Sequence, residues 1–169
     1  MAALASESGT LRLPSAAARA FPALNESGTG TLRWFGFRVY DARLWVNDER
    51  PSPDRPFVLA LRYARDFESE SIARASIDEI ERLGFGTERD RVRWLAVMQS
   101  IFPDVRKGHE LAGLNMPGRG VRFYLDGKAI GEVPDTEFAR AFFAIWLDPR
   151  TKAPALRIAL LGEREGRQR

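Results

Sequence analysis

Apolar and polar residues alternate most clearly in residues 28–46, a run rich in aromatic and β-branched side chains. A period of two is typical of a β-strand that buries one face. From Val39 onward, one face collects the residues that a core accepts: Tyr40, Ala42, Leu44 and Val46. Gly36 interrupts the run, which therefore predicts two strands or one strand bent at that glycine.

Four later segments also have strand character. Residues 57–63 place Phe57 and Tyr63 on one apolar face. Residues 109–116, 121–125 and 129–133 predict an antiparallel meander, and Asp126-Gly127 between the last two is a strong tight-turn pattern. These segments belong to a single antiparallel sheet in our interpretation.

Helical spacing of apolar residues replaces the alternation in four other segments. They are residues 69–83, 88–102, 135–147 and a short one from Pro154 to Gly162. Asp135 is a plausible N-cap of the third. That helix is apolar on nearly every side, so other elements must cover most of it.

The order of these elements predicts an α+β domain, in which one antiparallel sheet carries helices on one face. Residues 1–27 are expected to form a mostly irregular N-terminal extension. Residues 28–162 form the domain, and residues 163–169 form a solvated basic tail.

Composition excludes several classes of function. The 169 residues include no cysteine and one histidine, His109, so neither a cysteine site nor a multi-histidine metal site can form, and we expect no metal or cofactor. The net charge of +3 is matched by Arg164, Arg167 and Arg169 of the tail, so no nucleic-acid partner is expected. The longest apolar run, residues 141–147, is far short of the roughly 20 residues of a membrane span.

The first residues lack the charged start and long apolar segment of a secretory signal. Ala3-Leu4-Ala5 nevertheless has the small-x-small pattern that ends one. We therefore expect a soluble protein that is periplasmic if a signal has been removed, and cytoplasmic otherwise.

Arg33 stands out because its neighbours are unusually apolar. Arg33, Phe35 and Phe37 share one face of their strand, whereas Leu32 and Trp34 share the other, so alternation does not decide which face is buried. A guanidinium in a dry cleft would bind an anion strongly. The alternative is that Arg33 pairs with Asp41, Asp66 or another carboxylate and has a purely architectural role.

Several phrases occur together in a recognisable order. They are Gly30-Thr-Leu-Arg33, Val39-Tyr-Asp-Ala-Arg-Leu-Trp45, Phe102-Pro-Asp-Val105, residues 138–151 and Leu160-Leu-Gly162. The set resembles the bacterial branch of the chalcone isomerase-like family over about residues 28 to 162. The resemblance implies an open-faced β-sandwich, in which a curved antiparallel sheet is covered on one side by helices and a ligand cleft lies between the two.

The family includes enzymes that close a chalcone to a flavanone and relatives that bind fatty acids. By the resemblance, Arg33 corresponds to the arginine that stabilises the anion in the enzymes. Tyr40 stands where the enzymes carry a threonine, and Ala144 lies near the position of a serine or threonine. Phe67 is the nearest aromatic residue to an expected tyrosine. These departures favour binding over cyclisation.

The sequence thus predicts a non-catalytic binding protein for a fatty acid or a similar amphipathic anion. Arg33 would bind the head group in the cleft between sheet and helices, and Tyr40 and Tyr63 would contribute hydroxyl groups. The alternative is a chalcone isomerase-type intramolecular lyase or isomerase acting on a phenolic or enone substrate, with Arg33 as electrophile and Tyr40 or Tyr63 as acid. A further alternative is a protein-interaction module that uses Trp34, Trp45 and the basic tail.

Overall fold

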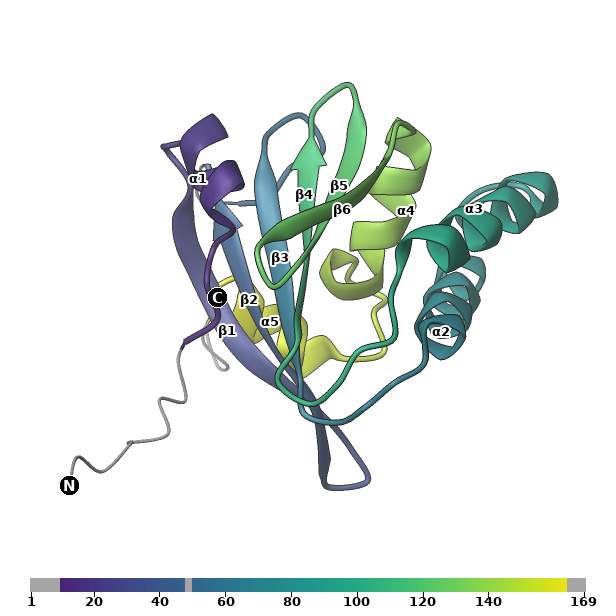
Figure 1. Ribbon diagram of the computed structural model, residues 1–169, viewed down its shortest axis with the longest axis horizontal. Coiled ribbons are helices and arrows are strands. Elements are labelled where there is room, and N and C mark those ends of the chain that lie inside the picture. The colour runs from purple at the N-terminus through teal and green to yellow at the C-terminus, as the bar shows by residue number, and fades with distance from the viewer. Residues whose placement is uncertain (1–9, 48–49, 164–169) are drawn as a thin grey trace, which may run out of the picture.

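Six strands form one antiparallel sheet in the computed structural model of the chain, which describes residues 10–47 and 50–163 (Figure 1). Each strand pairs with its neighbours in chain order, from β1 at one edge to β6 at the other. The strands are β1 (Asn25–Trp34), β2 (Phe37–Val46), β3 (Phe57–Tyr63), β4 (Glu110–Met116), β5 (Gly120–Leu125) and β6 (Lys128–Val133).

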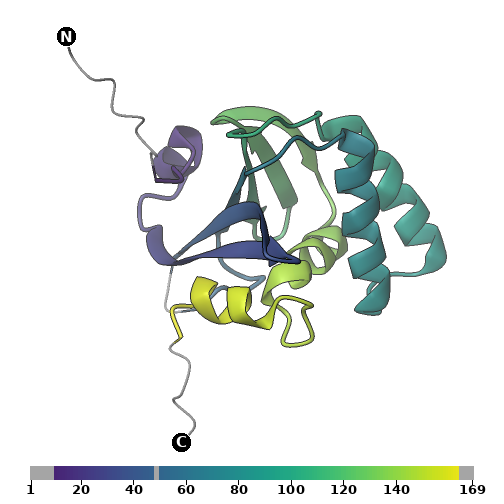
Figure 2. The ribbon, with the colours of Figure 1, turned by 90° about the horizontal axis from the view of Figure 1, so that it is seen from below.

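The helices lie on both sides of this sheet (Figure 2). On one side, α5 contacts β1, α4 contacts β5, and α2 and α3 form a pair that contacts α4 and β6. The short helix α1 packs on the opposite face. The helices are α1 (Ser15–Ala20), α2 (Ser69–Arg82), α3 (Glu88–Ile101), α4 (Thr136–Leu147) and α5 (Pro154–Leu160).

The predicted antiparallel sheet and its turns are confirmed. Residues 28–46 contain two strands that meet at a turn around Gly36, and β3 has the predicted bounds. The turn between β5 and β6 holds both Asp126 and Gly127 in the left-handed region, with φ values of 48° and 83°. Asp-Gly is the pair that this two-residue turn favours, because glycine adopts positive φ without steric cost.

Two apolar clusters sandwich the sheet. The predicted core face of β2 is confirmed, since Ala42, Leu44 and Val46 are buried against the helices. Trp45, on the other face, is also buried, in a second cluster with Leu11 of the N-terminal segment. That segment was expected to be mostly irregular, but it includes α1, and β1 begins at Asn25. The signal-like residues Ala3 and Ala5 and the basic tail beyond Glu163 lie outside the described residues.

The N-cap of α4 ties this helix to α3. The Asp135 carboxylate accepts hydrogen bonds from the backbone N–H groups of Glu137 and Phe138, both at 3.0 Å. It also accepts one from the indole N–H of Trp94 at 2.9 Å. Partial burial alone would raise the pKa of Asp135, but these hydrogen bonds lower it below its ordinary value. The predicted cap is therefore confirmed.

Asp135→Ala should lower the free energy of unfolding by about 1 to 2 kcal/mol at neutral pH, because it removes a cap and leaves a buried indole N–H unpaired. The bonded form is the carboxylate, so this stabilisation is complete above the ordinary pKa of about 4 and is lost as the pH falls through the lowered pKa. Urea denaturation at neutral pH and at a pH below the lowered pKa measures the loss in the free energy of unfolding. Asp54→Ala, in an exposed loop, is the control, and equal losses in the two variants would contradict the assignment.

Candidate functional site

Tyr40 and Tyr63 lie directly opposite each other on β2 and β3. Their rings meet edge to face with centroids 5.8 Å apart. The indole N–H of Trp146, from α4, donates a hydrogen bond of 2.9 Å to the Tyr40 hydroxyl. The structure therefore brings together two of the three predicted ligand-binding residues, under the helical layer.

Burial keeps both phenols protonated. It raises the pKa of Tyr40 to about 12, although the hydrogen bond from Trp146 opposes the shift. Burial also raises the pKa of Tyr63, and Tyr40 adds to that effect. The Tyr40 oxygen accepts the hydrogen bond from Trp146, and the hydroxyl hydrogen of Tyr40 remains available to donate another. No hydrogen bond to the Tyr63 hydroxyl is found among the residues described.

Arg33 lies apart from the tyrosines, near the turn that joins β1 and β2. Its side chain is exposed, and a register shift separates it from Leu32. The residue opposite Tyr40 is Leu32, whereas Arg33 faces Arg38. This corrects the predicted surroundings of Arg33, because its side chain is exposed and lines neither of the two pockets described below.

The predicted architectural partners of Arg33 are engaged by other groups. Asp41 binds Arg38 and accepts a hydrogen bond of 2.7 Å from Thr31. Asp66 accepts a hydrogen bond of 2.8 Å from the backbone N–H of Lys107. A ligand-binding role for Arg33 stays a prediction.

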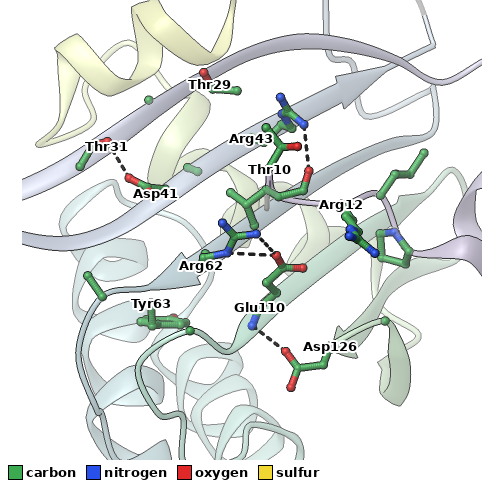
Figure 3. A pocket seen from close by; sticks show the side chains of 18 of the residues that line it. Thr10, Arg12, Thr29, Thr31, Asp41, Arg43, Arg62, Tyr63, Glu110 and Asp126 are labelled. Atoms are coloured by element: carbon green, nitrogen blue, oxygen red, sulfur yellow. Dashed lines mark hydrogen bonds and ion pairs between the residues drawn. The ribbon is translucent and has the colours of Figure 1, made fainter. Parts of the chain in front are cut away.

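A wide groove of about 1020 Å³ lies on the sheet face that α1 partly covers (Figure 3). We call it the outer groove, and it runs between residues 10–15 and the strands. Its charged side chains largely neutralise one another: Arg62 donates to Glu110 at 3.1 Å, and Asp41 binds Arg38. Threonine and charged side chains form about half of its lining, and Leu11, Ala42 and Tyr63 are among the apolar residues beside them.

Arg43 fixes the N-terminal segment across the outer groove. Its guanidinium donates a hydrogen bond of 2.9 Å to the Leu11 carbonyl (Figure 3). The guanidinium lies 5.7 Å from the centroid of the Trp45 ring. It also pairs with Glu26 at 3.3 Å. These contacts make Arg43 a structural residue, because they hold the segment that covers the second apolar cluster.

A second pocket, of about 510 Å³, lies beside α4 at the opposite end of the sheet from the β1–β2 turn. We call it the α4 pocket. Residues of α4 form one wall, and the ends of β3 and β4 with residues 50–54 form the other. Its apolar lining comprises Phe57, Phe85, Met116, Ala139, Phe143, Ala144, Leu147 and Leu161. The Phe57 and Phe143 rings meet edge to face at 4.6 Å.

Three arginines border the α4 pocket. Arg50 pairs with Glu163 at 3.0 Å, and Arg157 donates through Nε to the Leu147 carbonyl at 2.8 Å. Arg140 is exposed, and the described part of the chain provides no hydrogen-bond or ion-pair partner for it. Arg140 precedes Ala144 by four residues and Leu147 by seven, so all three lie along one face of α4.

Sequence reasoning missed Arg140 and Arg157 because each occupies an ordinary surface position of an amphipathic helix. The pattern that could have identified Arg140 is its place in residues 135–147, where it is the one basic residue among apolar ones. A helix so apolar keeps a cation only on a face that the core does not use. Ala144, noted from the sequence as the position of a serine or threonine, lines the same pocket.

Two classes of site are not found. The described residues contain no group of three or more histidine, cysteine, aspartate or glutamate side chains arranged to hold a metal ion. None of the helices in that part of the chain has the length and apolar character needed to cross a bilayer.

Comparisons with known proteins agree with the fold. The family model described as chalcone isomerase-like matches residues 5–162. An uncharacterized protein of Haemophilus influenzae is 31% identical over 137 residues, which cover 80% of this chain and 67% of that protein. The crystal structure of a fatty-acid binding protein of Arabidopsis thaliana superposes with a TM-score of 0.65 and 14% identity, over 83% of this chain and 87% of that chain. At that identity the superposition shows a shared fold alone.

Tyr40→Phe should lower the free energy of unfolding by about 1 to 3 kcal/mol, because it leaves the Trp146 indole N–H buried without an acceptor. Tyr63→Phe is the matched control and should change it by less than about 0.5 kcal/mol, because no hydrogen bond is lost. Urea denaturation at neutral pH measures both. A larger loss in Tyr63→Phe would contradict the assigned hydrogen bond.

Titration of Tyr40 should also make the free energy of unfolding depend on alkaline pH. The pKa of Tyr40 is raised in the folded state, so its contribution is complete below the ordinary value of about 10 and is lost as the pH rises toward about 12. Wild-type stability should therefore fall over that interval. Tyr40→Phe should show a smaller fall, and an unchanged slope would rule out titration of a buried Tyr40.

Proposed function

The chain belongs to the chalcone isomerase-like family, and on that basis we propose that it is a non-catalytic binding protein for a fatty acid or a similar amphipathic anion. The observation that carries the proposal is the α4 pocket, in which an unpaired guanidinium stands beside an apolar lining. A protein of the same fold is named a fatty-acid binding protein, which supports this class of ligand.

The α4 pocket suits the apolar body of such a ligand. Its volume of about 510 Å³ is within the range of small-molecule pockets, about 300 to 1,000 Å³. Phe57, Phe143 and Leu147 offer the kind of surface that an acyl chain buries favourably. Each buried methylene contributes about 0.8 kcal/mol, so several are needed to offset the entropy lost on binding.

Arg140 is our candidate for binding the head group. Its guanidinium has no internal acid to displace among the described residues, and a carboxylate can accept two parallel N–H bonds from it. Arg157 borders the pocket from α5, and its Nε–H donates a hydrogen bond to the Leu147 carbonyl. The terminal amino groups of Arg157 are therefore available for a second contact. Three carboxylates also line the pocket, those of Asp54, Glu137 and Asp148. Arg150 binds Asp148 through two hydrogen bonds of 2.9 Å.

The arrangement of Arg33 and Tyr40 favours binding over isomerisation. An isomerase of this kind needs its cation and its acid on the same reacting group. Arg33 is exposed and opposite Arg38, whereas Tyr40 lies under the helices opposite Leu32. The head-group role that the sequence predicts for Arg33 stays a prediction, and the titration below compares it directly with Arg140.

Saturated fatty acids of increasing length should bind progressively more tightly, by about three- to fourfold per methylene, until the α4 pocket is full. Arg140→Ala should weaken binding by about tenfold at low salt, because a charge-assisted hydrogen bond is lost. The corresponding alcohols should bind equally to wild type and variant. Isothermal titration calorimetry measures these affinities.

Arg33→Ala is the matched control, since it removes an exposed guanidinium from the other end of the sheet. Ala144→Phe should abolish binding by filling the pocket. Thermal unfolding monitored by circular dichroism verifies that this variant is folded. If Arg33→Ala weakens binding and Arg140→Ala does not, the head group lies at Arg33 and the α4 pocket is the wrong site. If no fatty acid binds to wild type, the proposal fails altogether.

A further inference from the structure

The turn between β1 and β2 exposes three aromatic side chains. Trp34, Phe35 and Phe37 are 70%, 83% and 60% exposed, and among the described residues Val92 is the only other large hydrophobic side chain exposed to this degree. The turn projects beyond the neighbouring loops at the bottom of Figure 1. We call these three residues the aromatic tip. Exposing such a cluster to water is energetically unfavourable, so the cluster indicates a surface that binds an apolar partner.

The backbone holds the aromatic tip in an outward-facing conformation. Phe35 has a φ of 49° and Gly36 a φ of 78°, so both lie in the left-handed region. Glycine adopts this region freely, but a bulky residue there is strained. The Trp34 and Phe35 rings are 5.0 Å apart and form one continuous apolar surface. The chain thus keeps a phenylalanine exposed at a position where a small polar residue would fit more easily.

Cations surround the aromatic tip. Arg33 is exposed within the hairpin, and the guanidinium of Arg65 lies 4.8 Å from the centroid of the Phe37 ring. Arg106 and Lys107 are exposed on a neighbouring loop, which a hydrogen bond from Gly108 to the Tyr63 carbonyl holds at the same end of the sheet.

Several acids also lie at this end of the sheet. Glu110 is level with Asp41 across β3 and pairs with Arg62, and Asp126 accepts a hydrogen bond from the backbone of Glu110. Asp41 pairs with Arg38, and Asp66 accepts from the backbone of Lys107. Arg33 and Arg65 have no acidic partner in the described part of the chain. The aromatic tip is therefore flanked by two guanidinium groups that have no acidic partner among the described residues.

We propose that the aromatic tip docks on an anionic lipid membrane, with Trp34, Phe35 and Phe37 inserted at the headgroup level and Arg33 and Arg65 on the lipid phosphates. Aromatic side chains favour the membrane interface, and cations near an anionic leaflet add electrostatic attraction. A second copy of this chain would bring like charges together. A projecting tip also fits a deformable surface better than a preformed groove.

This inference is independent of the proposed ligand. The α4 pocket opens at the other end of the sheet, beside the ends of β3 and β4, and shares no residue with the aromatic tip. Variants of the tip should therefore bind fatty acid in solution as wild type does. Failure of one proposal leaves the other standing.

Flotation with vesicles tests the inference. Wild type should bind vesicles of phosphatidylcholine mixed with phosphatidylglycerol and bind phosphatidylcholine alone much more weakly. The triple variant Trp34→Ala, Phe35→Ala, Phe37→Ala should lower the partition coefficient at least about tenfold. Arg33→Ala and Arg65→Ala should each lower it by about fivefold at low salt. Val92→Ala is the matched control for loss of an exposed hydrophobic side chain.

Tryptophan fluorescence supplies a second readout. Trp45, Trp94 and Trp146 are at most 7% exposed, so a blue shift on adding the mixed vesicles should come from Trp34 and disappear in Trp34→Phe. Three results would overturn the inference: no binding to the mixed vesicles, equal binding by wild type and the triple variant, or self-association in the absence of lipid that the triple variant abolishes.

Discussion

Helix α4 carries more apolar surface than the sheet can cover, and this excess determines much of the structure. Seven of its twelve residues are buried, and they face the sheet, α2 and α5. Apolar surface near its C-terminal half, at Phe143, Ala144 and Leu147, remains in contact with the α4 pocket. The hydrophobic effect thus accounts both for the position of the helix and for the character of the pocket beside it. Asp135 fixes where the helix begins, through bonds to its own backbone and to Trp94.

The two ends of the sheet differ in chemistry. One end combines an apolar pocket with Arg140, and the other combines exposed aromatic side chains with Arg33 and Arg65. Between them, Tyr40 and Tyr63 form a buried pair whose phenols stay protonated. In this account the tyrosines stabilise the packing of the sheet against α4, and the two proposed binding sites lie at the ends of the strands.

Local patterns predicted the elements well because their causes are local. Alternation located the buried face of β2, Asp126-Gly127 located a turn, and Asp135 located a helix start. The surroundings of Arg33 could not be predicted, since alternation does not decide the buried face before Gly36 and a register shift lies beside Leu32. The second apolar cluster was missed because residues 10–20 show no clear period, and it depends on contacts distant in sequence, such as that of Arg43 with Leu11. Arg140 was missed for a similar reason, because its pocket forms only when residues 50–57 meet α4.

Nuclear magnetic resonance titration of the isotope-labelled protein with dodecanoate tests the central claim most directly. The account predicts that backbone resonances of Ala139, Ala144 and Leu147, together with those of residues 50–57, shift in a saturable manner. Resonances of the β1–β2 turn should remain unchanged. Shifts centred on Arg33, Tyr40 and Tyr63, with none along α4, would contradict the account.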